Sequence, residues 1–171
     1  ETADTLSRFF TRLEKRNIKI ANFRADCGSY SEDIIKVVLE HSKRFYIRAS
    51  NCMSRLEAFE KIKDWRPVEI NFEQLEVASF EFDDFMPEAG LRLVVQRQEI
   101  KNKDGIQNIF GKQYVYRAVL TNDWEMREED VIRFYNARGG SERNFDVQNN
   151  DFGWAHLPFS FMNENLSLIH I

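Results

Sequence analysis

Residues 18–50 read IKIANFRADCGSYSEDIIKVVLEHSKRFYIRAS, and this stretch decides the fold class. Its start, Ile18 to Ala25, predicts a strand that ends at the turn begun by Asp26. Ser31 is then placed to cap a helix with acidic residues in its first turn, where they suit the helix dipole. Arg44 to Ser50 predicts a second strand. A helical crossover between two strands predicts parallel pairing and an α/β fold.

The segments on either side of this unit predict a helix and then a run of strands. Before it, Asp4 precedes apolar residues at helical spacing, and the helix should end near Arg16-Asn17. After it, a short helix is expected over residues 56–65, with Pro67 as its breaker. Further strands are expected in Val68–Asp83, Leu91–Glu99 and Tyr114–Leu120. Between the last two lie a turn signal, Asp104-Gly105, and a bulge signal, Gly111. Residues 51–122 therefore read as a β-rich insertion.

A late helix carries an unusual row of side chains. Glu125 to Asp130 would be its acidic first turn. The row is spaced 3, 4, 3 and 4, which spans an arc of about 80° on an ideal helix, and its members are Tyr135, Arg138, Glu142, Phe145 and Asn149. An arginine and a carboxylate on a partly apolar face indicate a helix that presents charge to a phosphate or a metal ion. The Gly139-Gly140 pair interrupts this helix, and a break there would divide the row.

Composition predicts a globular protein of one domain, or one domain with an insertion. The 171 residues are 43% hydrophobic and 30% charged, which excludes a disordered chain. No apolar run approaches the roughly 18 residues of a membrane span, and we expect a cytoplasmic location with no membrane partner. Cys27 and Cys52 form no CxxC, and the three histidines offer no zinc spacing. Both thiols are expected to be buried and reduced.

Charge is unevenly distributed along a chain whose net charge is −4. Residues 1–50 hold ten basic and seven acidic side chains, and residues 91–122 hold six and two. The six basic residues of the second segment are Arg92, Arg97, Lys101, Lys103, Lys112 and Arg117. They have two interpretations: a path for a DNA backbone, or edge-strand charges that discourage aggregation. Trp124 could stack on a displaced base, but a core tryptophan is the favoured interpretation and the one we expect.

Asp26 and Glu142 are the candidate metal ligands. Asp26 follows a strand, and the carboxyl ends of strands in open α/β sheets are where ligands gather. Each residue has an ordinary alternative, since a turn aspartate can bind neighbouring backbone N–H groups and most helical glutamates are solvated.

Taken in order, these segments resemble the DDE transposases of bacterial insertion sequences over nearly the whole chain. The matching segments are Arg24–Tyr30, Thr121-Asn122, the Tyr-x2-Arg-x3-Glu motif at Tyr135–Glu142, Phe145 and Asn150–Trp154. The resemblance implies an RNase H-like catalytic domain with a β-rich insertion before its last catalytic helix. It also implies metal-dependent phosphodiester cleavage and strand transfer at insertion-sequence ends.

The resemblance assigns roles to individual residues. Three carboxylates of the family hold two divalent ions, Mg²⁺ or Mn²⁺; Asp26 resembles the second catalytic aspartate and Glu142 the catalytic glutamate. Tyr135 and Arg138 resemble partners of the DNA backbone beside the scissile phosphate. Asn149 occupies the position of the family's lysine, where it can hydrogen-bond a phosphate but brings no charge. The resemblance also implies two partners. One is double-stranded DNA, both as the transposon end and as the target, and the other is a second copy of the chain in a paired-end complex.

The resemblance also predicts what this chain lacks. The first catalytic aspartate belongs to an upstream strand, and nothing before Asp26 resembles it, because Asp4 opens a helix. We therefore expect residues 1–50 to be an RNase H-like core without its first strands, inactive alone and with residues 18–25 as an exposed sheet edge. The insertion at 51–122, the catalytic helix region at 123–154 and a truncated tail at 155–171 would follow.

Two alternatives stay open at this point. The chain could be a non-catalytic DNA-binding remnant of a transposase, which Asn149 and the absent first aspartate both allow. It could also be an unrelated α/β domain that binds a small molecule. The latter would need an apolar pocket and no clustering of Asp26 with Glu142.

Overall fold

The computed structural model describes residues 2–50, 53–100 and 113–139 of the chain. The chain divides into two compact units, Glu1–Tyr135 and Asn136–Ile171, and nearly all described residues belong to the first. Within the described ranges, no helix is both long enough and apolar enough to cross a membrane.

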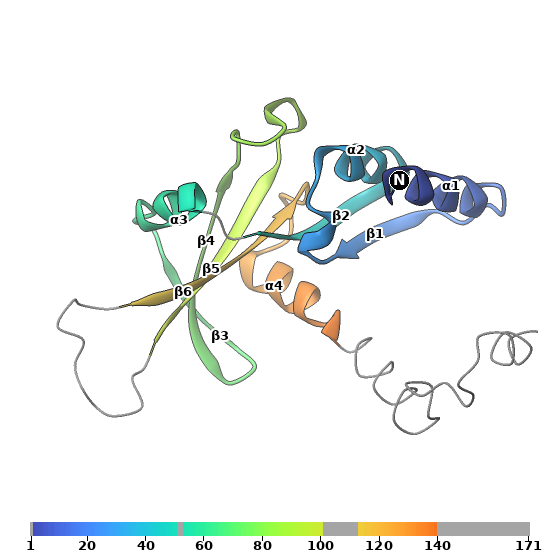
Figure 1. Cartoon of the computed structure of the whole chain (residues 1–171). Coiled ribbons are helices and arrows are strands. Elements are labelled where there is room, and N and C mark those ends of the chain that lie inside the picture. Colours follow the sequence, from blue (N-terminus) through green and yellow to red (C-terminus); the bar gives the residue numbers. More distant parts are fainter. Residues whose placement is uncertain (1, 51–52, 101–112, 140–171) are drawn as a thin grey trace, which may run out of the picture. The chain divides into compact units, whose positions relative to one another are not determined.

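Six strands form one mixed sheet in the order β1-β2-β6-β5-β4-β3 (Figure 1). β1 (Ile20–Ala25) pairs in parallel with β2 (Ser42–Ala49), and α2 (Glu32–His41) connects them. The register of this pair places Phe23 beside Phe45. The predicted strand–helix–strand unit is therefore confirmed, and β1 lies at one edge of the described sheet.

The strands of the predicted insertion extend this same sheet. β6 (Tyr114–Thr121) pairs antiparallel with β2 on one side and with β5 (Arg92–Glu99) on the other. β4 (Glu73–Glu81) pairs with β5 and then with β3 (Arg66–Ile70). Because pairing is continuous from β2 to β3, the strands of the predicted core and those of the predicted insertion share one backbone hydrogen-bond network.

Two local predictions around β3 are corrected. The short helix α3 spans Met53–Glu60, so it ends before the expected residue 65. Pro67 lies within β3, at the other edge of the described sheet, where a strand tolerates a residue without an N–H. Asn71 and Phe72 both have positive φ and form the tight turn into β4. The turn signal at Asp104-Gly105 and the bulge signal at Gly111 lie outside the described residues.

The first helix, α1 (Thr2–Glu14), ends in a Schellman motif. The N–H of Asn17 donates to the carbonyl of Glu14, and the N–H of Ile18 donates to that of Leu13. Asn17 has φ 58°, the left-handed conformation that such a cap requires and that asparagine tolerates. The expected end near Arg16-Asn17 is confirmed, because a short polar side chain at this position lets the chain reverse into β1.

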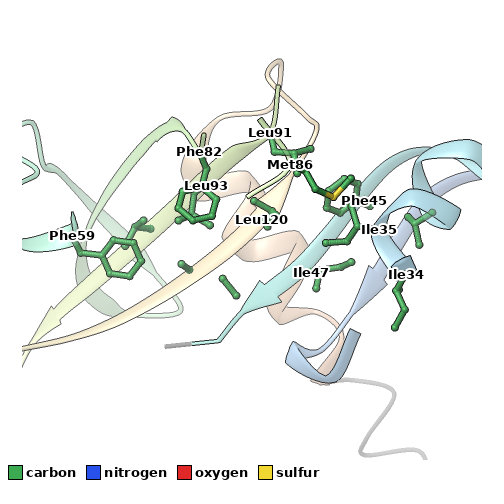
Figure 2. Close-up of a cluster of buried hydrophobic side chains, with 14 of the residues drawn as sticks. Ile34, Ile35, Phe45, Ile47, Phe59, Phe82, Met86, Leu91, Leu93 and Leu120 are labelled. Atoms are coloured by element: carbon green, nitrogen blue, oxygen red, sulfur yellow. The ribbon is translucent and has the colours of Figure 1, made fainter. Parts of the chain in front are cut away.

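The core consists of two clusters on opposite faces of the sheet. Alternate residues of β2 divide between them: Phe45 and Ile47 enter the first cluster with residues of α2, and Tyr46 enters the second with residues of α4. Figure 2 shows the first cluster, which extends from Ile34 and Ile35 of α2 across the sheet. It reaches Met86 and Leu91, on either side of the short 3-10 helix η2 (Pro87–Ala89). α1 and α2 thus cover one face of β1 and β2, and α4 covers the other (Figure 1).

The late helix α4 spans Glu128–Asn136, with the predicted acidic residues in its first turn. It ends earlier than expected, and Ala137 and Arg138 form a turn. The single helical face expected for the row of five therefore does not reach Arg138. Gly139 and Gly140 follow in the sequence, and glycine is about 1 kcal/mol less favourable than alanine in a helix.

Candidate functional site

Asp26 lies directly after β1 and begins the 3-10 helix η1 (Cys27–Ser29). Its Oδ1 accepts the backbone N–H of Gly28 at 3.0 Å, and its side chain is exposed. A Cβ added at Gly28 would lie 3.1 Å from this oxygen, so glycine leaves the carboxylate its space. Asp26 therefore makes the hydrogen bond expected of a turn aspartate. That bond uses only one carboxylate oxygen, and the carboxylate remains open to solvent.

Arg24 joins the end of β1 to the last turn of α4. Its Nη1 donates to the carbonyl oxygen of Phe134 at 2.6 Å, and its guanidinium lies 4.9 Å from the centroid of the same ring. Tyr46 of β2 packs against Phe134 as well, with 4.7 Å between ring centroids. A cation at a helix C-terminus interacts favourably with the helix dipole. The end of α4 is consequently held beside the strand end that carries Asp26.

The other predicted site residues are placed as follows. Tyr135 is 8% exposed and belongs to the second core cluster, so its ring packs α4 onto the sheet. Arg138 is half-buried in the turn after α4, in the second unit of the chain. Glu142 and Asn149 lie outside the described residues. The approach of Asp26 to Glu142 remains a prediction.

A buried aspartate that sequence reasoning did not single out organises the start of α4. Asp123 is 1% exposed, and its Oδ2 accepts the Tyr46 hydroxyl at 2.7 Å. Its Oδ1 accepts the N–H groups of Glu125 and Met126, at 2.9 and 3.1 Å. Burial alone would raise the pKa of Asp123, but these hydrogen bonds and the nearby Arg44 lower it below the usual range. The signal was an Asx-turn aspartate between a strand and an acidic helix start.

A partly buried carboxylate, Glu128, ties α4 to the antiparallel strands. Its Oε1 accepts from Arg92 and from the Ser79 hydroxyl, each at 2.7 Å, and its Oε2 accepts from Arg66 at 2.8 Å. Burial works against ionisation, but the hydrogen bonds from Ser79 and Arg66 and the charge of Arg92 lower the pKa of Glu128 to about 2. Arg66 also pairs with Glu129. These contacts keep the first turn of α4 on the sheet.

The predicted basic hairpin is largely neutralised where it is described. Arg92 is 5% exposed and bound to Glu128. Arg97 pairs with Glu76 at 2.6 Å and lies 4.3 Å from the ring centroids of both Trp65 and Tyr114. Arg117 is exposed, and the three lysines, Lys101, Lys103 and Lys112, lie outside the described residues. Arg92 and Arg97 thus act within the fold, and the DNA-path interpretation rests on the remaining four residues.

Two expectations about single residues are wrong. Trp124 is 51% exposed, with its Nε1 donating to the Gly90 carbonyl at 3.0 Å, so it is not a core tryptophan. Cys27 is an exposed free cysteine rather than a buried one. Composition alone does not show that either side chain lies at the surface. Cys52 lies outside the described residues.

Of the two predicted metal ligands, the structure describes Asp26. No group of three or more His, Cys, Asp or Glu side chains gathers in the described part of the chain to hold an ion. Carboxylate oxygens are the donors that Mg²⁺ prefers, and an exposed carboxylate with one oxygen engaged by a backbone N–H fits one position of such a site. Glu142, the other predicted ligand of this chain, is outside the described residues.

Comparison with known families gives a match over almost the full length. The family described as "Transposase DDE domain" matches residues 2–171. No curated protein and no solved structure matches the chain. The six-stranded mixed sheet, covered by helices on both faces, is consistent with an RNase H-like domain of this kind.

Proposed function

Since the chain belongs to the transposase DDE domain family, we propose that it forms part of the catalytic domain of a DNA transposase. The reaction would be metal-dependent phosphodiester cleavage and strand transfer at insertion-sequence ends. One observation carries the proposal: the exposed carboxylate of Asp26 stands at the end of β1, and Arg24 holds the last turn of α4 to that same strand end. Family membership supports a DNA substrate, and paired DNA ends support a dimer as the working form.

Asp26 and Glu142 would hold Mg²⁺ or Mn²⁺ in this proposal. Such ions, when bound, activate the attacking oxygen and stabilise the leaving oxygen of a phosphodiester. The chain's own contribution at Asp26 is orientation, because the Gly28 N–H fixes one oxygen and directs the carboxylate to solvent. Glu142 lies six residues after the end of α4 in the sequence.

The remaining residues would bind and position DNA. Arg138 and Asn149 would hydrogen-bond phosphate oxygens, the arginine with its planar fork and the asparagine without charge. Tyr135 is buried, so its proposed role is to hold α4, the helix that precedes Arg138, on the sheet rather than to contact DNA over a large area. Trp124 offers an exposed ring on which an unpaired base could stack.

A titration of Mn²⁺ into the full chain, followed by electron paramagnetic resonance of the free ion, tests this proposal. Asp26→Asn and Glu142→Gln should each weaken Mn²⁺ binding at least about tenfold, and the double variant should lose little more, because coupled ligands are non-additive. Asp83→Asn and Glu40→Gln, which alter exposed carboxylates elsewhere, should leave binding unchanged. This readout needs no catalytic turnover.

The same titration separates the enzyme from a DNA-binding remnant. Unchanged Mn²⁺ affinity in both single variants would overturn the shared metal site and leave the remnant as the better description. Additive losses would assign the two carboxylates to separate sites, which also contradicts the proposal.

A further inference from the structure

One face of α1 and the turn after it carries a row of exposed cations. The first four are spaced 4, 3 and 1 residues apart, which places them within an arc of about 100° on a helix, and the fifth follows the cap at Asn17. The five residues are Arg8, Arg12, Lys15, Arg16 and Lys19. The opposite side of α1 faces the core through Phe10, which is 2% exposed. The chain is therefore locally basic on a surface that belongs to a protein of net charge −4.

Four of the described arginines in the sheet are compensated by carboxylates, whereas most of these cations have no such partner among the described residues. Arg44, Arg66, Arg92 and Arg97 all have carboxylates within ion-pair distance. Arg8 pairs with Asp4 at 2.9 Å, but Arg12, Lys15, Arg16 and Lys19 make no ion pair with any residue that the structure describes. The nearby Glu14 binds His41 at 2.8 Å. A row of uncompensated cations has a positive potential that an anionic partner would satisfy.

The surface beside the row is hollowed and partly apolar. A hollow of about 540 Å³ is lined by Phe9, Arg12, Leu13, Lys15 and Arg16. Phe9 is 53% exposed and Ile18 is 45% exposed. A duplex backbone offers both parts of the matching chemistry, with phosphates for the cations and apolar sugar edges for these side chains.

Helix stability alone explains only part of the row. Basic residues in the last turn of a helix interact favourably with its dipole, at about 0.3–1 kcal/mol each. That effect applies to Arg12 in the last turn and to Lys15 and Arg16 directly after it. It falls off within one turn, so it does not account for Arg8 or for Lys19 beyond the cap.

We propose that this basic face of α1 binds the phosphate backbone of duplex DNA away from the position of cleavage. The proposal rests on the DNA-cleaving function proposed above. The Schellman turn places the row at the amino end of β1, whereas Asp26 follows its carboxyl end. A strand of this length spans on the order of 20 Å, which corresponds to roughly six base pairs along one DNA strand. The face would thus hold DNA that flanks the cleaved bond.

The test is the salt dependence of duplex binding by the full chain, measured by fluorescence anisotropy of a labelled 30-base-pair duplex between 50 and 200 mM KCl. Removing two phosphate contacts with Arg12→Gln/Arg16→Gln should reduce the log–log slope by about 2 and weaken binding at least about tenfold at 50 mM. The charge-preserving Arg12→Lys/Arg16→Lys variant should retain the slope. Lys61→Gln/Lys63→Gln removes the same charge from exposed positions after α3 and should change the slope little.

An unchanged slope in the α1 variant, or an equal change in the Lys61/Lys63 control, would overturn the proposal. So would a chain that binds no duplex at any of these salt concentrations. Because Mn²⁺ binding at Asp26 is read without DNA, failure of the α1 surface and failure of the metal site are separate results.

Discussion

Two aspartates follow strands in this protein, and their surroundings are opposite. Asp123, after β6, is 1% exposed and accepts hydrogen bonds from the Tyr46 hydroxyl and two backbone N–H groups. Asp26, after β1, is exposed and accepts a single backbone N–H, from Gly28. Both positions look alike in the sequence, as a polar residue where a strand gives way to a helical turn.

This difference indicates which of the two carboxylates is available to bind a ligand. The two oxygens of Asp123 are already satisfied, and its charge is compensated by Arg44, so it stabilises the junction of β2, β6 and α4. Asp26 retains acceptor capacity at the surface. A structural carboxylate should be costly to remove and indifferent to metals, and a functional one should be the reverse.

The largest expected effect is the loss of stability on replacing Asp123. Asp123→Ala should lower the free energy of unfolding by about 4 kcal/mol, because the Tyr46 hydroxyl and two backbone N–H groups lose their acceptor in a buried site. Urea unfolding followed by circular dichroism measures it. Asp123→Asn, which can still accept the backbone N–H groups, should cost clearly less. A loss below 1 kcal/mol for the alanine variant would remove the distinction between the two aspartates.

A somewhat smaller effect is expected from acid. The pKa of Glu128 is lowered to about 2 from an ordinary value of 4.5. Its stabilising contribution is therefore complete above pH 4.5 and is lost as the pH falls towards 2, to a total of roughly 3 kcal/mol. Unfolding free energies measured from pH 6 to pH 2 should fall steeply below pH 4.5, and Glu128→Gln should flatten that fall. Parallel curves for the two proteins would show that Glu128 is not the group that titrates.

The smallest effect is expected at Asp26 itself. Asp26→Asn should change the free energy of unfolding by less than about 0.5 kcal/mol, because the side chain is exposed and an asparagine oxygen can still accept the Gly28 N–H. The urea measurement used for Asp123 applies here as well. A loss above 2 kcal/mol would mean that Asp26 is a structural residue like Asp123, and the comparison would fail.

Local patterns predicted the first part of the fold well. The parallel pair β1 and β2, the helix between them and the cap of α1 at Asn17 all depend on residues close in sequence. Alternation of apolar residues, capping side chains and turn formers express such local preferences directly. The end of α4 was missed because the decision between a helix and a turn at Ala137 and Arg138 involves small energy differences.

Errors about the charged and exposed residues have a different origin. Arg92 reads as a surface cation in a basic segment, yet it is buried against Glu128, 36 positions away. The partner of Asp123, Tyr46, is 77 positions away. Trp124 and Cys27 were expected to be buried as apolar side chains, but both are exposed.

The sequence by itself determined the α/β class, the strand that delivers Asp26 and the family motifs, because these depend on local backbone preferences and on the order of residues. The tertiary structure alone decided which charges are compensated. It paired Arg66 and Arg92 of the sheet with carboxylates of α4, and it left Arg12 of α1 without an ion pair among the described residues. It also anchored the end of α4 beside Asp26 through Arg24. Ion pairs and burial depend on residues that only folding brings together, and no short-range pattern encodes them.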